Sequence, residues 1–172
     1  MSNETLYNTS YIIERICAIT EKNPCKKELQ KIAFLIEASG LDLGYSHGLH
    51  FYGPYSSILD SCTMTLYAEG VVKIHYSGYS HLLSVDNEKF LENNNMTEEH
   101  RTQIDEIIDR FKDYSPSDLE LLTTAIYAYD HLENKSMESV IAGVKKIKGA
   151  KYSDSKIRGE LENLRYFEKE FA

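Results

Sequence analysis

The residues best suited to chemistry in this sequence are two histidines, His47 and His50, which lie close to Asp42 and Asp60 along the chain. Imidazole and carboxylate groups can bind a metal ion or act as a general base. Neither an HxH nor an HExxH spacing is present, however. We therefore expect no metal site here.

Other reactive side chains follow no catalytic pattern. Ser56 and Ser57 lack the G-x-S-x-G context of a serine nucleophile, and a helix cap explains Ser56. The chain has neither a G-x-G-x-x-G nor a P-loop pattern for a nucleotide. Its 3 cysteines are odd in number and form no C-x-x-C, which favours buried thiols. The sequence therefore predicts neither catalytic residues nor a cofactor, and we expect a protein that is not an enzyme.

A run of basic residues is the strongest electrostatic signal, with Asp154 as the only acid within it. It could mark a site for an acidic partner or nucleic acid, where it would form a second corner like a helix-turn-helix. The interpretation we favour is that it offsets the nearby acids Glu160, Glu162, Glu168 and Glu170. The members of this possible basic patch are Lys145, Lys146, Lys148, Lys151, Lys156 and Arg158.

Composition limits the possible partners and location. The 172 residues carry a net charge of −8, so nucleic acid is disfavoured except through a local patch. The first ten residues lack the features of a signal peptide, and no apolar run approaches the ~20 residues of a membrane helix. We expect a cytoplasmic protein without membrane contact. Six of the 13 tyrosines fall between Tyr45 and Tyr79, which suits either a contact surface or the rim of a small core.

The chain is organised around one predicted turn, Tyr52-Gly53-Pro54-Tyr55-Ser56. Before it, Leu49 and Phe51 alternate with polar residues, as in a half-buried strand. Gly-Pro ends the strand, and Ser56 stands where the N-cap of a helix belongs. The five turn residues are the candidate partner-binding site: Tyr52, Gly53, Pro54, Tyr55 and Ser56.

Residues 1–86 have the predicted element order of a winged helix. Two helices, one over 9–20 and one after Pro24, precede the strand, the helix that starts at Ser56 and a hairpin over 71–85. The second helix is apolar almost all round and therefore central. Its polar remainder, Lys27, Gln30 and Lys31, could face a phosphate but more simply faces water.

Residues 87–172 are predicted to form an all-helical region that packs on the first half as one compact unit. The most linker-like stretch, 86–95, separates the two. Thr97 caps the first helix of this half, and Ser115-Pro116-Ser117-Asp118 is a strong signal for the start of the next. Two further helices follow, the last capped by Ser153. The fold class expected is mainly α (α+β).

Several of these motifs resemble a known family. The segments are Lys27–Leu35 (KELQKIAFL), Tyr52–Ser56 with Leu59, Leu66 with Gly70–Val72, Asp118–Tyr127 (DLELLTTAIY) and Lys148–Ser153 (KGAKYS). Together they resemble the YwgA-like family of small prokaryotic and phage-borne proteins, and more distantly the SocA-like (Panacea) antitoxin domain. The resemblance covers about 26–164. Gly149 and Ala150 depart from the family's proline, which bears on that turn alone.

The resemblance implies a binding module without chemistry, because Panacea relatives neutralise toxins or act as adaptors through protein contact. We therefore expect a small regulatory protein that binds a protein partner, in phage or toxin-antitoxin biology. The alternative is a DNA-binding winged-helix regulator, and an enzyme is a distant third. Residues 56–68 contain Asp60 and no Lys or Arg, a poor inventory for a helix that reads the major groove.

Overall fold

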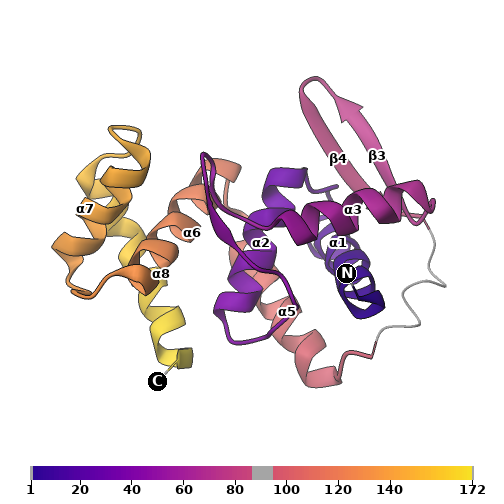
Figure 1. The fold of residues 1–172 in the computed structure, drawn as a ribbon, viewed down its shortest axis with the longest axis horizontal. Coiled ribbons are helices and arrows are strands. Elements are labelled where there is room, and N and C mark those ends of the chain that lie inside the picture. The colour runs from indigo at the N-terminus through magenta and orange to yellow at the C-terminus, as the bar shows by residue number, and fades with distance from the viewer. Residues whose placement is uncertain (1, 87–94, 172) are drawn as a thin grey trace.

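The structure is a computed structural model that describes residues 2–86 and 95–171, with side chains through 167. As expected, the described residues are mainly helical, but they contain two small antiparallel hairpins where the sequence predicted one hairpin and a lone strand (Figure 1). The helices are α1 (Asn3–Thr20), α2 (Lys26–Ala38), α3 (Ser57–Ala68), α5 (Glu98–Phe111), α6 (Pro116–His131), α7 (Met137–Lys148) and α8 (Asp154–Phe171). The strands are β1 (Gly48–His50), β2 (Gly53–Tyr55), β3 (Val72–Ser77) and β4 (Ser80–Val85).

The predicted helix starts are confirmed by side-chain caps. The hydroxyls of Ser56, Thr97 and Ser115 each accept a hydrogen bond from the backbone N–H three residues on. At α6 the bond is reciprocal, because the Asp118 carboxylate also accepts from the Ser115 N–H. These caps satisfy N–H groups that a helix leaves unpaired at its first turn.

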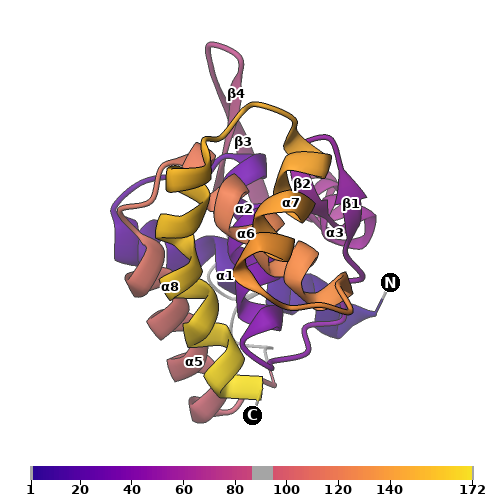
Figure 2. The same cartoon turned by 90° about the vertical axis from the view of Figure 1, so that its left-hand side faces the viewer.

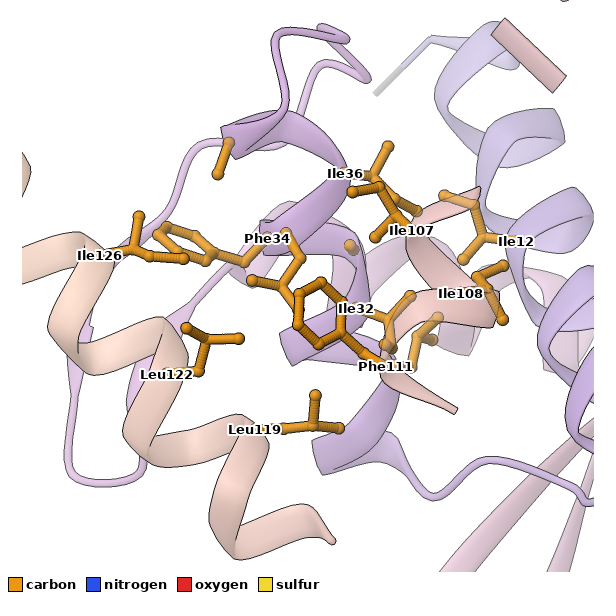
Figure 3. Close-up of a cluster of buried hydrophobic side chains, with 14 of the residues drawn as sticks. Ile12, Ile32, Phe34, Ile36, Ile107, Ile108, Phe111, Leu119, Leu122 and Ile126 are labelled. Carbon is orange, nitrogen blue, oxygen red and sulfur yellow. The ribbon is translucent and has the colours of Figure 1, made fainter. Parts of the chain in front are cut away.

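Helix α2 lies at the centre of the apolar core, as its pattern predicted. Figure 3 shows Ile32, Phe34 and Ile36 of α2 surrounded by side chains from three other helices. Those neighbours are Ile12 of α1, Ile107, Ile108 and Phe111 of α5, and Leu119, Leu122 and Ile126 of α6. The core therefore contains side chains from both sides of the linker-like stretch and joins the two halves of the chain.

The two hairpins lie in different surroundings. β3–β4 projects away from the helices, as both views show, while β2 packs against α2 and α6 (Figures 1 and 2). Val72 pairs with Val85 at the base of the projecting hairpin, and Ser77 with Ser80 at its tip. Only the base is buried, through Val72 and Leu83.

The prediction of one half-buried strand over 49–52 is wrong. β1 is exposed along its length, and Leu49 and Phe51 are 44% and 80% exposed. The buried strand is β2, which pairs antiparallel with β1 through Leu49 and Pro54. Alternation in the sequence shows only that a strand has two different faces. Here β1 is the outer strand of a two-stranded ribbon, and β2 lies between β1 and the helices, so neither face of β1 is buried.

The linker-like stretch falls mostly on 87–94, outside the described residues. None of the helices in the described part of the chain combines the length and apolarity needed to cross a bilayer.

Candidate functional site

The predicted turn is the second strand of a tight hairpin. Phe51 and Tyr52 form its two-residue tip, and Gly53 follows with a φ of +90°, a backbone conformation that strongly favours glycine. A Cβ at this position would lie 2.8 Å from the Oγ1 of Thr124. The hairpin therefore needs glycine both for its backbone and for its close approach to α6.

The exit of the hairpin is held by one side chain of α2. The Gln30 amide accepts a hydrogen bond from the Ser56 N–H at 2.8 Å and donates to the Ser56 carbonyl at 2.9 Å. Both residues are buried. Buried backbone groups need partners, and Gln30 supplies both at the point where strand changes to helix.

Lys31 also supports the hairpin from beneath. Its ammonium donates to the Pro54 carbonyl at 2.6 Å, and the residue is only 2% exposed. The expectation that Lys31 and Gln30 face water is therefore wrong. A helix that is apolar nearly all round is buried nearly all round, so its polar side chains are enclosed and must bond internally.

Glu120 of α6 is the centre of the polar cluster below the hairpin. Its carboxylate is 1% exposed and accepts from three ammonium groups, on Lys27 at 2.5 Å, Lys148 at 2.9 Å and Lys151 at 2.6 Å. Lys148 also donates to the Phe51 carbonyl at 2.8 Å. One buried acid thus links α2, α7 and the tip of the hairpin.

The cluster shifts the titration of its members. Burial alone would raise the pKa of Glu120, but hydrogen bonds from Lys151, Lys27 and Lys148 outweigh it and lower that pKa to about 2. Burial lowers the pKa of Lys31 to about 7, and repulsion from Lys148 and Lys27 adds to this while Glu120 opposes it. At pH 7 the Glu120 carboxylate is ionised and Lys31 is partly neutral.

Above this cluster the hairpin presents apolar side chains to solvent. Phe51 and Tyr52 at the tip pack edge to face, with ring centroids 5.0 Å apart, and Leu49 lies beside them on β1. Tyr52 is 52% exposed, and the Lys27 ammonium lies 5.0 Å from its ring centroid. We call these three residues, Leu49, Phe51 and Tyr52, the hairpin tip patch.

The structure divides the predicted basic patch. Lys148 and Lys151 join the Glu120 cluster and so meet the predicted turn, an association that no sequence pattern indicated. The others except Lys146, which is exposed, pair with acids on the surface. Lys145 pairs with Asp154, Lys156 with Asp118 at 2.6 Å, and Arg158 with Glu138 at 3.5 Å.

The acids that pair with the basic patch, Asp154, Asp118 and Glu138, are not the glutamates of α8 that were expected to offset it. Glu160 instead bonds Tyr114 and Asn163, and the side chains of Glu168 and Glu170 lie outside the described residues. Only the general expectation that the outer cations are neutralised locally agrees with the ion pairs of the structure.

The histidines and acids singled out for metal or base chemistry have separate partners. His47 bonds Glu37 at 3.0 Å, while Asp42 accepts from the Gly44 N–H within its own loop. His50 packs on the Tyr55 ring, and Asp60 pairs with Lys26 at 3.3 Å. Within 2–86 and 95–167, no three His, Cys, Asp or Glu side chains are grouped as metal ligands.

Sequence reasoning missed the role of Glu120, although a signal was present. The residue lies between Leu119 and Leu121, in a helix whose residues 119–126 are all buried. An acid in such a segment must be paired inside the protein. The identity of its partners, which come from α2, α7 and the α7–α8 turn, depends on tertiary packing.

The chain matches no protein-family model, and no curated protein matches it significantly.

Proposed function

We propose that this chain is a small, non-enzymatic interaction or regulatory protein of the cytoplasm that binds a protein partner through the β1–β2 hairpin. The observation that carries the proposal is an apolar patch at the tip of a hairpin whose second strand is fixed by buried hydrogen bonds from Gln30 and Lys31. Within this patch Phe51 is 80% exposed.

Hydrogen bonds that hold the hairpin in place make its exposed apolar patch more effective in binding. Association loses affinity when it must order a flexible loop, and a loop that is ordered beforehand avoids this cost. Three buried or partly buried side chains, Gln30, Lys31 and Lys148, hold the hairpin through its own backbone. Aromatic side chains at the centre of a contact supply most of the binding energy of protein interfaces.

The family resemblance supports the same conclusion. Tyr52–Ser56 is the most specific part of the resemblance to YwgA-like proteins, and the more distant Panacea domains act through protein contact. We therefore place the function in phage or toxin-antitoxin biology, with a toxin or another regulatory protein as the partner.

A DNA-binding winged helix is the second candidate, favoured by the order α1, α2, α3 and the projecting β3–β4 hairpin (Figure 1). In that interpretation α3 is the recognition helix and β3–β4 the wing. Charge argues against it. Helix α3 has no Lys or Arg, and Lys73, the basic residue of the wing, pairs with Asp86 at 2.7 Å.

The test is affinity capture from lysate of the source cell with three baits: the parent protein, Phe51→Ser and the control Tyr79→Ser. Tyr79 is a fully exposed aromatic residue on the other hairpin. We expect one protein to be recovered by the parent and by Tyr79→Ser but not by Phe51→Ser. Equal recovery by all three baits would overturn the proposal, as would tight, steeply salt-dependent binding to random duplex DNA in a gel shift.

A further inference from the structure

A small pocket opens beside the hairpin tip patch, between β1–β2, the first turns of α2 and the start of α3. Its volume is about 190 Å³, and His50, Tyr52 and Tyr55 line it from the hairpin. Lys26, Lys27 and Lys31 line it from α2. A mostly apolar wall to which three lysine side chains contribute suits a ligand that has an anionic end on an apolar stem.

Lysine side chains outnumber carboxylates in the lining of this pocket. Among the described residues, the cations Lys27, Lys148 and Lys151 all pair with the single carboxylate of Glu120. Lys26 pairs with Asp60, and Lys31 bonds a neutral carbonyl. The pocket lining itself contains three lysines, Lys26, Lys27 and Lys31, and one carboxylate, that of Asp60, in a chain whose net charge is −8.

We propose that the pocket receives the carboxylate of a Glu or Asp side chain of the partner protein, inserted beside Lys27 while the hairpin tip patch packs against apolar residues around it. This inference rests on the proposed function and names the chemistry of the partner: an acidic side chain set within an apolar surface. Lys27, 32% exposed and already between the Tyr52 ring and Glu120, is the cation best placed to donate to it.

Size and charge favour a side chain over a nucleotide or a nucleic acid. Pockets for drug-sized ligands have volumes of ~300–1,000 Å³, whereas this one has room for little more than one side chain. Long-range repulsion from the net charge of −8 acts against a polyanion but weakly against one carboxylate carried by a partner.

Lys31 adds a second consequence of binding. With a pKa lowered to about 7, chiefly by burial, it is largely neutral at pH 8. A carboxylate close by favours the ammonium form, so binding at pH 8 should take up protons. Lys148, Lys27 and Glu120 are the charged groups that act on Lys31 in the free protein.

The test is an NMR titration of ¹⁵N-labelled protein at pH 8 with two capped peptides, acetyl-Gly-Glu-Gly-amide and acetyl-Gly-Gln-Gly-amide. We expect saturable shifts of the Gly53 and Tyr55 amides with the glutamyl peptide only, and net proton uptake when the heat of binding is measured in two buffers. Lys27→Met should weaken this binding by about tenfold, the effect of one charge-assisted hydrogen bond.

Two further variants make the outcome specific. Lys146→Met removes an exposed lysine outside the pocket and should bind the peptide like the parent. Lys26→Met frees the Asp60 carboxylate at the pocket and should weaken binding, which keeps the test valid if Lys27→Met fails to fold. Equal shifts with both peptides, or equal losses in Lys27→Met and Lys146→Met, would overturn the pocket assignment.

The two proposals fail in different ways. If Phe51→Ser loses the captured partner but neither Lys27→Met nor Lys26→Met does, and the glutamyl peptide does not bind, the pocket assignment is wrong and the protein-binding function stands. If Phe51→Ser captures the partner like the parent, the proposed function itself fails, whatever the peptide does.

Discussion

At the scale of single residues, the hairpin depends on a glycine that touches a fixed hydroxyl. Thr124 donates to the Glu120 carbonyl at 2.7 Å, so its Oγ1 is held in place at the point where a Cβ on residue 53 would come. Steric exclusion therefore adds to the backbone requirement set by a φ of +90°.

We predict that Gly53→Ala lowers the free energy of unfolding by about 2–4 kcal/mol, from backbone strain and overpacking together. Gly70→Ala is the matched control, because Gly70 has a φ of +73° and no atom within 4 Å of its would-be Cβ. Its cost should be about 1 kcal/mol, from strain alone. Urea denaturation measures both, and equal losses would show that the contact with Thr124 does not matter.

Glu120 gives the cluster a pH dependence of known sign. Its pKa is about 2 in the folded protein against an ordinary 4.5, so the unfolded chain binds the proton more tightly. The stabilisation is complete above about pH 4.5 and is lost as the pH falls toward 2.

We predict that Glu120→Gln costs about 3–5 kcal/mol at pH 7, because Lys148 is left buried without its counter-charge. The difference between parent and variant should narrow when urea denaturation is repeated at pH 3. Asp154→Asn, which removes the acid from an exposed pair, should change stability little at either pH. If the difference in free energy of unfolding between the parent and Glu120→Gln were the same at pH 7 and pH 3, Glu120 would not be ionised in the folded protein.

At the scale of elements, the junction between β2 and α3 is fixed by hydrogen bonds of a single residue, Ser56. Ser56 caps α3 with its side chain and bonds Gln30 with both of its backbone groups. The cap was predictable from the sequence, because Ser after Gly-Pro-Tyr and before an apolar helical stripe is a local signal. The Gln30 contact was not, since residues 26 apart in sequence meet only through packing.

The same division between local and tertiary signals explains what the sequence predicted of the site. The turn and the basic run were visible as separate patterns, but their junction at Glu120 depends on three lysines from α2, α7 and the α7–α8 turn. The exposed β1 strand was mistaken for a half-buried one because alternation reveals two faces without showing which strand of a ribbon lies outside.

We predict that Gln30→Met loosens the hairpin exit without unfolding the protein. The Ser56 N–H and carbonyl would both lose their buried partner, at about 1–3 kcal/mol for each. Hydrogen exchange of the Ser56 amide should therefore accelerate by at least about tenfold, while the Phe34 and Leu35 amides within α2 stay protected. Unchanged protection of Ser56 would mean that Gln30 does not hold the hairpin.

At the scale of the whole molecule, one core serves both halves of the chain. Ile12 and Ile36 from the first half belong to the same buried cluster as Ile108 and Leu122 from the second (Figure 3). An ion pair reinforces the contact, with Arg15 of α1 bonding both carboxylate oxygens of Asp105 in α5 at 2.8 and 2.9 Å. The candidate site also combines both halves of the chain, because α2 of the first half and α6 of the second supply most of its buried polar groups.

We predict one cooperative unfolding transition for residues 1–86 and 87–172. Far-ultraviolet circular dichroism and the fluorescence of the 13 tyrosines should give coincident urea curves. Leu122→Ala, which opens a cavity where α6 meets α2, should shift both curves together and cost about 2–5 kcal/mol. Two separated transitions would show that the halves fold independently.

The most direct measurement of the central claim is photo-crosslinking from the hairpin tip. The photoreactive residue p-benzoylphenylalanine replaces Phe51 in one sample and Tyr79 in another, and both are irradiated in the source cell. We predict one protein crosslinked from position 51 and not from position 79, with an acidic side chain next to the linked residue. Crosslinks from position 79 alone, or the same product from both hairpins, would contradict binding through β1–β2.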